Sequence, residues 1–233
     1  MITLFDYLPS QNAWKVRLLL TQLGLPYEQK FVRIFDGEGQ SDEYLRISPR
    51  GTVPAILLSD GRALPESNVI LSYLAEGSAF LPGDPYDKAK VLQWLMFEAT
   101  YVQPSIAFLR FVKLTRAAAY PAKALDWRIS LGYRALDAMN DQLQRTGFIA
   151  GDQYTIADMS LYAYTHRAED AGIHLNAFPH FQAWLARVRA QPGFGPPVHP
   201  YSIDPSSTKD LPSFRPWRER KDRDERATTM PMT

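Results

Sequence analysis

The sequence predicts an α/β unit followed by an all-helical unit. Strand and helix patterns alternate as far as about residue 77, and the last two strand patterns flank an Asp-Gly turn at residues 59–62, which is typical of a hairpin. Residues 77–85 are rich in glycine and proline, as in a linker. Helical periodicity then continues to about residue 191. We therefore expect a small mixed sheet with helices packed on it, joined to a helical bundle.

The composition is that of a globular protein with a substantial core. Of 233 residues, 45% are apolar and 22% are charged, and the length allows one or two domains. The net charge of +1 gives no reason to expect nucleic acid or an anionic membrane as a partner. The lack of cysteine excludes disulfides, thiolate metal ligands and a protein thiol nucleophile. With no signal segment and no apolar stretch of roughly 20 residues, we expect a cytoplasmic protein.

The first unit begins with a strand and a helix separated by a polar turn. Gly24 is expected to end this helix, and Lys15 and Arg17 are expected on its solvated face or at a subunit contact. Ser67 is the expected N-cap of the last helix of the unit. Strands are predicted at residues 2–7, 27–34, 55–58 and 63–64, and helices at 13–23, 41–47 and from 67 to about 76.

The second unit shows inward helix faces and one capping motif. Its first helix carries a stripe of Val91, Leu95, Glu98 and Val102. Pro104 is predicted to kink that helix. Asp158 is predicted to be structural, because it and Thr155 can each cap the other's backbone N–H at a helix start. A second inward face is formed by Leu125, Ile129, Tyr133, Leu136, Met139 and Leu143, and the last helix is predicted from Phe178-Pro179 to just before Pro192.

The chain after Gly195 changes character. It is first rich in proline and then carries alternating charges from Arg215 to Arg226, with few apolar residues. Such a segment buries too little surface to order itself, so we expect a solvated and partly disordered tail. The alternative is a tail that packs over a pocket or a partner subunit.

Two short segments suggest where a ligand binds. Val53-Pro54 precedes a strand, and an X-Pro bond is the kind of peptide bond that adopts cis at low cost. A cis bond there would turn the Val53 backbone outward, beside Glu66 and Ser67. This arrangement suits an extended, peptide-like ligand with an amino acid head group.

These segments, in this order, resemble the cytosolic glutathione S-transferase family, in its bacterial, serine-type or theta-like form. The marks are Pro49-Arg50-Gly51-Thr52-Val53-Pro54, Glu66-Ser67 and Thr155-Ile156-Ala157-Asp158, and the resemblance spans residue 1 to about 195. It implies a thioredoxin-like domain at 1–77, a linker at 78–86, a helical domain at 87–198 and a tail at 199–233. It also implies a homodimer that uses glutathione and a small electrophile. We expect no metal, because the four scattered His residues show no metal-ligand spacing.

The resemblance also assigns roles to residues of the first domain. The Val53 backbone would pair with the cysteinyl part of glutathione, with Thr52 and Pro54 beside it. Glu66 and Ser67 would hold the γ-glutamyl group, and Gln40 would meet the glycyl end. For the catalytic position, which follows the first strand, it implies Ser10, with Asn12 as a second donor and Tyr7 as a lesser candidate. Classes that use a cysteine there are excluded.

The chemistry required of Ser10 is stabilisation of a thiolate. A thiol with a pKa of about 8.5 is only a few per cent ionised at neutral pH, and lowering its pKa by about two units requires roughly 2.7 kcal/mol. A hydroxyl donor and a helix N-terminus both favour the anion. The plainer interpretation is that Ser10 and Asn12 simply cap the helix. Candidates for a second-substrate pocket are Tyr101, Phe108, His166 and Tyr201, although aromatic residues at helical spacing are more often core.

We therefore predict a glutathione transferase that conjugates small electrophiles. One alternative is a glutathione-dependent isomerase of the maleylacetoacetate type, because Trp14-Lys15-Val16-Arg17 resembles a run in that class; the replacement of its serine-cysteine pair by Gln11-Asn12 disfavours it. The other alternative is a non-catalytic binding module with the same fold, for which the charged tail would suit a partner.

Overall fold

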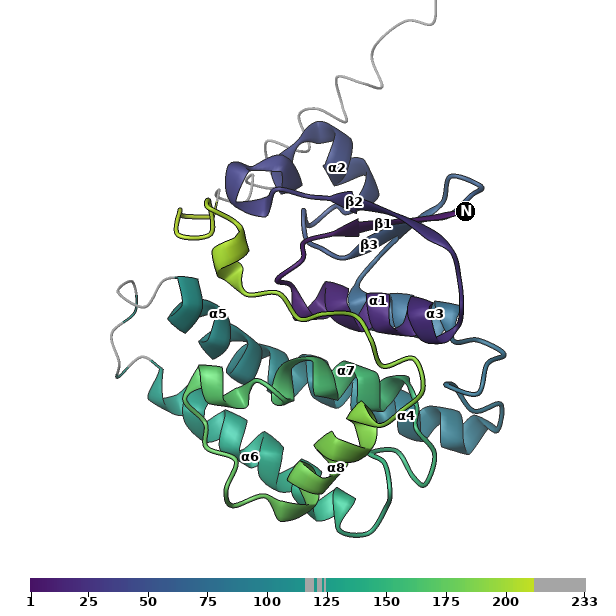
Figure 1. Cartoon of the computed structure of the whole chain (residues 1–233), viewed down its shortest axis with the longest axis vertical. Coiled ribbons are helices and arrows are strands. Elements are labelled where there is room, and N and C mark those ends of the chain that lie inside the picture. The colour runs from purple at the N-terminus through teal and green to yellow at the C-terminus, as the bar shows by residue number, and fades with distance from the viewer. Residues whose placement is uncertain (116–119, 121–122, 124, 212–233) are drawn as a thin grey trace, which may run out of the picture.

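The protein consists of a small α/β domain stacked on a helical domain (Figure 1). The computed structural model describes residues 1–115, 120, 123 and 125–211. The elements of the first domain are β1 (Ile2–Asp6), α1 (Gln11–Gln22), β2 (Tyr27–Phe31), α2 (Asp42–Ile47), β3 (Ala55–Leu57), β4 (Ala63–Pro65) and α3 (Ser67–Leu74). Those of the second are α4 (Pro85–Phe97), a π-helical segment (Glu98–Ala107), α5 (Phe108–Thr115), α6 (Asp126–Leu143), α7 (Ile156–Thr165) and α8 (Pro179–Arg189).

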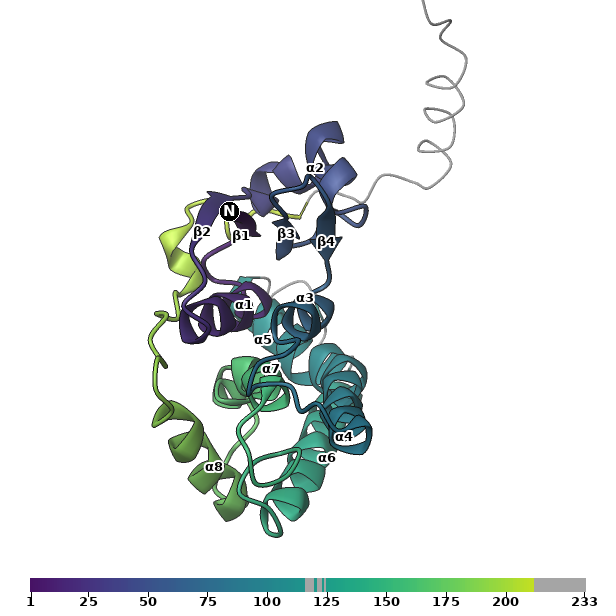
Figure 2. The ribbon, with the colours of Figure 1, turned by 90° about the vertical axis from the view of Figure 1, so that its right-hand side faces the viewer.

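The sheet has four strands in the order β2-β1-β3-β4. β1 and β2 are parallel, whereas β3 runs antiparallel to both β1 and β4. Helices α1 and α3 lie side by side between this sheet and the helical domain (Figure 2). This is the mixed sheet expected from the sequence, so the fold class is confirmed. β2 ends at Phe31, earlier than predicted, because the chain turns into a short 3₁₀-helix at Ile34–Asp36.

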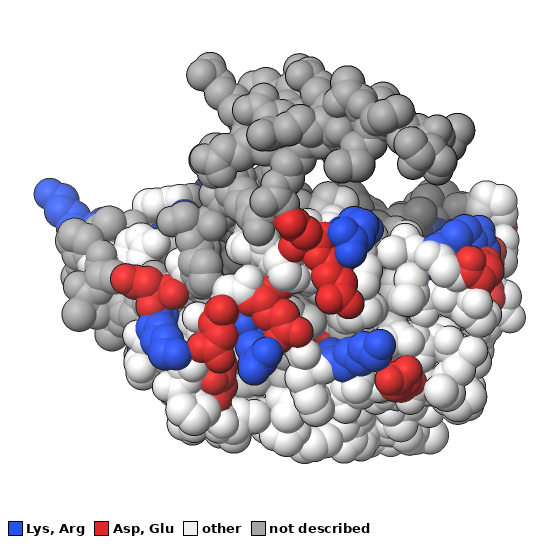
Figure 3. All heavy atoms as spheres, turned by 90° about the horizontal axis from the view of Figure 1, so that it is seen from above, with Lys and Arg blue, Asp and Glu red and all other residues white. Residues whose placement is uncertain are grey.

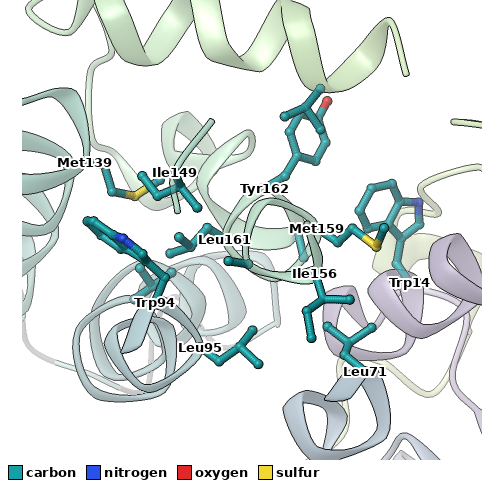
Figure 4. Close-up of a cluster of buried hydrophobic side chains, with 14 of the residues drawn as sticks. Trp14, Leu71, Trp94, Leu95, Met139, Ile149, Ile156, Met159, Leu161 and Tyr162 are labelled. Atoms are coloured by element: carbon teal, nitrogen blue, oxygen red, sulfur yellow. The ribbon is translucent and has the colours of Figure 1, made fainter. Parts of the chain in front are cut away.

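Helix α7 forms the centre of the helical domain (Figure 4). Its capping box is present, as predicted, with Thr155 and Asp158 each bonded to the other's backbone. Asp158 is buried and also accepts hydrogen bonds from the Ile149 N–H and the Trp184 Nε1, both at 2.8 Å. Burial raises the pKa of the Asp158 carboxyl to about 6. Asp158 is therefore structural, because it joins the loop before α7, the start of α7 and α8.

The two domains share one apolar interface. Trp14 and Leu71 of the first domain lie against Ile156 and Met159 of α7, and all four are buried (Figure 4). Helix α1 is therefore covered on two sides, by the sheet and by α7.

The expectation that Lys15 and Arg17 are solvated is wrong. The Arg17 guanidinium pairs with the Asp6 carboxylate at 2.6 Å, and the Lys15 ammonium lies 3.5 Å from the Glu98 carboxylate. Both cations are at most 6% exposed. Because the helix has no free face at these positions, each cation instead lies beside a carboxylate.

Pro104 lies inside a helix that continues through it. From Glu98 to Ala107 the backbone is π-helical, and the Phe108 N–H bonds to the Gln103 carbonyl five residues earlier. Arg128 donates to the Pro104 carbonyl. The wider helical turn accommodates the proline, which has no N–H, and π-helical segments are frequent at functional sites.

The described part of the tail packs on the first domain. It crosses from α8 to the vicinity of β1 and α2 (Figure 1). Asp204 accepts from the Tyr7 hydroxyl at 2.9 Å, and Ser206 and Lys209 both bond to Asp36. Residues 201–211 therefore contact the first domain, in line with the alternative of a tail that packs over a pocket, although most of these residues are exposed. Residues 212–233, including the charged run from Arg215, lie outside the described residues.

Candidate functional site

The loop before β3 and the start of α3 form one wall of the site. The Val53-Pro54 bond is cis, and in the described part of the chain the Val53 backbone has no hydrogen-bond partner. Glu66 precedes α3 with a φ of 72°, and no other described non-glycine residue has a positive φ. Glu66, and not Ser67, therefore occupies the N-cap position, and the predicted capping role of Ser67 is wrong. Its hydroxyl instead donates to the Asn12 Oδ1 at 3.3 Å.

A polar pocket of about 460 Å³, here called the Glu66 pocket, opens beside this wall. It brings together six of the eight residues predicted to act on glutathione. These are Asn12, Thr52, Val53, Pro54, Glu66 and Ser67. Arg50 lies at the rim, 3.6 Å from the Glu66 carboxylate, and Glu98 and Gln103 close the side formed by the helical domain.

A second pocket of about 200 Å³, here called the Ser10 pocket, lies beside the first. It contains the other two predicted residues, Ser10 and Gln40. Thr52 and Val53 line both pockets, so the two cavities share a wall. The rest of the lining is largely aromatic and aliphatic, from Tyr7, Ile34, Phe111, Tyr201 and Leu211.

Ser10 is the N-cap of α1, as the plainer interpretation predicted. Its hydroxyl oxygen accepts from the Ala13 N–H at 3.3 Å. A serine hydroxyl accepts through a lone pair and keeps its own proton to donate, so capping and anion binding are compatible. The oxygen also lies at the N-terminal end of α1, where the helix dipole favours a negative charge.

Tyr7 lines the Ser10 pocket, but its hydroxyl is engaged by the tail. It donates to the Asp204 carboxylate, and burial raises the pKa of the phenol far above its ordinary value. The Tyr7 ring also lies 6.2 Å from the Tyr201 ring. Tyr7 is thus a neutral group whose proton points to Asp204.

Of the four aromatic residues predicted to line a second-substrate pocket, Tyr201 lines the Ser10 pocket. It lies under the guanidinium of buried Arg110, at 5.6 Å, and next to Phe111. Tyr101, Phe108 and His166 do not line the pocket. His166 stacks on the Tyr162 ring at 4.4 Å, and burial lowers the pKa of its imidazole to about 4.

Four polar residues in or behind the wall of the Glu66 pocket were not predicted as site residues. Gln103 donates to the Asn12 Oδ1 at 2.8 Å and to the Glu98 Oε1 at 2.6 Å. The Asn68 amide donates to Glu98 at 2.9 Å and accepts from the Lys15 ammonium at 2.7 Å. Burial lowers the pKa of Lys15, and the Glu98 carboxylate opposes this shift. The available signal was Glu98 itself, an acidic residue on the apolar stripe of the first long helix.

Charge on the outer surface is mixed. On the described part of the face seen from above Figure 1, basic groups lie directly beside acidic ones (Figure 3). The exposed pairs Arg33–Glu38 and Arg62–Asp60 show the same pattern. Among the described residues, no helix is both long and apolar enough to cross a membrane, and no three His, Asp or Glu side chains meet as metal ligands.

Sequence and structure comparisons point to the same family. The family described as "Glutathione S-transferase, N-terminal domain" matches residues 9–76, and "Glutathione S-transferase, C-terminal domain" matches residues 118–187. A glutathione S-transferase from Pseudomonas fluorescens Pf-5 has a similar structure, with a TM-score of 0.79 and 41% identity, covering 84% of this chain and 98% of that one.

The names of two further relatives mention a reaction or a bound ligand. The disulfide-bond oxidoreductase YfcG of Escherichia coli K12 is 28% identical over 84% of this chain and 93% of its own. A Pseudomonas putida glutathione transferase, solved with one glutathione disulfide per subunit, has a TM-score of 0.74 and 28% identity, covering 83% of this chain and 88% of that one. With both family domains matched and the fold shared, the chain belongs to the glutathione S-transferase family.

Proposed function

We propose that the protein is a glutathione transferase that conjugates the glutathione thiolate to small apolar electrophiles. The observation that carries this proposal is the pair of pockets that share Thr52 and Val53, one polar and one apolar. A tripeptide in the polar pocket would bring its sulfur to this shared wall. An electrophile in the apolar pocket would then lie next to the sulfur.

In the Glu66 pocket, the proposal places the γ-glutamyl group against Glu66 and Ser67. The carboxylate of that group would lie at the N-terminus of α3, where backbone N–H groups favour an anion. The Val53 backbone would pair with the cysteinyl residue, and Thr52 and Pro54 would shape the wall around it. Gln40, across the shared wall, would meet the glycyl end.

The thiolate would be stabilised by Ser10 and Asn12, which stand at the start of α1. A hydrogen bond to the charged form of a group lowers the pKa of an acid, and the helix dipole adds to this effect. No general base is required for attack, because the thiolate is itself the nucleophile. The electrophile's leaving group departs as the carbon–sulfur bond forms.

The test is conjugation of an aryl halide by the wild type and by variants of the two donors. Ser10→Ala and Asn12→Ala should each lower kcat/KM by about tenfold or more, for about 1.4 kcal/mol of lost anion stabilisation. Ser10→Ala also removes a helix cap, so Ser10→Gly, which costs the cap little, is the matched variant. Ser41→Ala removes the cap of α2, where Ser41 accepts from the Tyr44 N–H, and serves as the control. If neither donor variant loses activity, or the wild type neither conjugates nor binds glutathione, the proposal fails.

A second candidate function is reduction of disulfides by glutathione. It is favoured by the likeness to YfcG, by the glutathione disulfide in the Pseudomonas putida relative and by the lack of cysteine in this chain. A bound glutathione thiolate would attack one sulfur of the disulfide and displace the other as a thiolate. A second glutathione would then displace the product and form glutathione disulfide. Formation of glutathione disulfide instead of a thioether identifies this reaction.

We also propose a cytoplasmic homodimer. Exposed apolar side chains lie on α3 and α4, including Val69, Tyr73, Leu92 and Met96. Val69 and Met96 also line the Glu66 pocket, so a partner that covers this face would border the glutathione site. An apolar surface that spans two helices is typical of a protein–protein interface.

A further inference from the structure

We infer that Gln103 and Glu98, both on the π-helical segment, are positioning residues that hold the Asn12 amide with its N–H groups toward the glutathione sulfur. This inference rests on the proposed role of Asn12 as a donor to the thiolate. Its basis is a chain of hydrogen bonds from Lys15 to Asn12 in which each donor and acceptor is fixed by the chemistry of its neighbour.

The chain begins at a buried cation. The Lys15 ammonium has only donors, so the Asn68 atom that faces it at 2.7 Å must be the amide oxygen. The Asn68 nitrogen then faces the Leu95 carbonyl at 3.0 Å and the Glu98 Oε2 at 2.9 Å, both of which accept. The orientation of Asn68 is therefore set from both sides.

The Glu98 carboxylate in turn fixes the orientation of the Gln103 amide. An ionised carboxylate only accepts, so the Gln103 atom 2.6 Å from the Glu98 Oε1 must be the amide nitrogen. The same nitrogen carries a second N–H, which faces the Asn12 side chain at 2.8 Å. The Asn12 atom at that contact must therefore be the oxygen. The Ser67 hydroxyl donates to the same oxygen.

What remains is the Asn12 nitrogen. With Oδ1 held by two donors, Nδ2 lies on the opposite edge of the amide and has no acceptor among the described residues. Asn12 lines the Glu66 pocket, in which the charged side chains are Arg50, Glu66 and Glu98. An amide flipped the other way would present its oxygen to the ligand, and an oxygen repels a thiolate.

The hydrogen bond between Gln103 and Asn12 connects the two domains. Asn12 belongs to α1 of the first domain, yet the residue that orients it belongs to the second. The wider turn of the π-helix places Glu98 and Gln103, five residues apart, at one shared contact. The helical domain thus contributes to the glutathione side of the site as well as to the acceptor pocket.

The test is a double-mutant cycle read out as the pKa of the bound glutathione thiol, measured from the ultraviolet absorbance of the thiolate against pH. Gln103→Met removes the donor at similar size and should raise this pKa by about half to one unit. In an Asn12→Ala background it should have no further effect, because its action passes through Asn12. Gln182→Leu, which removes an exposed amide on α8, is the control and should leave the thiol pKa unchanged.

A second variant makes the test independent of lost packing. Gln103→Glu keeps the size of the side chain but removes the N–H groups that face Asn12 and Glu98, and it adds a carboxylate that by itself raises the thiol pKa. Only the part of the rise that is lost in an Asn12→Ala background reports on the Asn12 amide, and that part should be at least as large as in Gln103→Met. The inference is overturned if Gln103→Met weakens only folding or glutathione affinity, or if it shifts the thiol pKa equally with and without Asn12. If Asn12→Ala leaves the thiol pKa unchanged while Ser10→Ala raises it, the inference fails and the proposed transferase function stands.

Discussion

At the scale of single residues, the environment of a side chain decides whether its polar group is available for chemistry. Ser10 caps α1 with its oxygen and still has a proton to donate, so its structural role does not compete with its proposed one. Tyr7 is the opposite case, because its proton is held by Asp204. The Tyr7 hydroxyl, the lesser candidate for the catalytic role, is therefore engaged by the tail.

His166 gives a prediction about pH. Its imidazole is neutral in the folded protein, with a pKa lowered to about 4, whereas the unfolded chain takes up a proton near pH 6.5. As the pH falls from about 6.5 to about 4, the unfolded state binds a proton that the folded state does not, so the free energy of unfolding should fall. The full shift corresponds to about 3 kcal/mol, and the partial exposure of the ring reduces this to about 2 kcal/mol.

The measurement is urea unfolding at about pH 7.5 and about pH 4.5. His166→Phe keeps a ring for the stack on Tyr162 and should lose this part of the pH dependence. Because Asp158 contributes equally in both proteins, the comparison isolates His166. The exposed His180, changed to Phe, is the control. An identical pH dependence in wild type and His166→Phe would refute the prediction.

At the scale of elements, the close approach of α6 to the π-helical segment depends on the small size of Gly132. Gly132 lies on the buried side of α6, where a Cβ would be 2.4 Å from the Ile173 Cδ1 and 3.4 Å from the Ile106 Cγ1. Ile106 belongs to the π-helical segment, so this glycine lets α6 approach the helix that carries Glu98 and Gln103. A larger residue would therefore disturb both the core and the segment behind the site.

Gly132→Leu should lower the free energy of unfolding by about 1–3 kcal/mol, the usual cost of overpacking a core. Gly132→Ala should be close to neutral, since the better helix propensity of alanine, about 1 kcal/mol, offsets the displacement of the end of Ile173. Ala138→Leu, at an exposed position of the same helix, is the matched control. A Leu variant as stable as the wild type would show that α6 has room at this position.

At the scale of the whole molecule, a buried ion pair connects the domains. Lys15 of α1 and Glu98 of the helical domain are both almost fully buried, at 0% and 1% exposure. Removing one partner of such a pair leaves the other charge buried and unpaired, which is far more costly than losing an exposed pair. The contact between the domains is therefore specific as well as apolar.

Glu98→Ala should lower the free energy of unfolding by about 3–5 kcal/mol, because it strands the Lys15 charge. The double replacement Lys15→Met with Glu98→Leu should recover most of this loss, since neither charge remains. Glu76→Ala, which breaks the exposed Lys88–Glu76 pair, should cost less than about 1 kcal/mol and is the control. If the double variant is no more stable than Glu98→Ala, the loss does not come from the stranded charge. Denaturant unfolding of all four proteins decides this.

The sequence predicts the local features of this molecule well and its long-range contacts poorly. The strands, the end of α1 at Gly24 and the Thr155–Asp158 capping box depend on neighbouring residues, and they are visible in periodicity and capping signals. Lys15 and Arg17 were misplaced because a helix covered on two sides has the same local pattern as one covered on a single side.

The site shows the same division. The loop residues around Val53 and the start of α3 lie close in sequence, so their assembly into one wall of the Glu66 pocket was predictable. The Tyr7–Asp204 bond joins residues 197 positions apart, and the Asn12–Gln103 bond joins residues 91 positions apart. No local pattern encodes such contacts, and the separation of Ser10 and Asn12 into adjoining pockets also required the structure.

The folded-back tail separates two parts of the site that could change independently. Tyr201 and Leu211 line the Ser10 pocket but lie beyond residues 118–187, the part of the chain that matches the C-terminal family domain. The polar pocket is formed by other residues, in the first domain and on the first long helix. Exchange of one short terminal segment would therefore remodel the Ser10 pocket, the proposed acceptor cavity, while the Glu66 pocket and the core stay in place. That modularity offers both natural selection and protein engineering a simple route to new acceptor preferences.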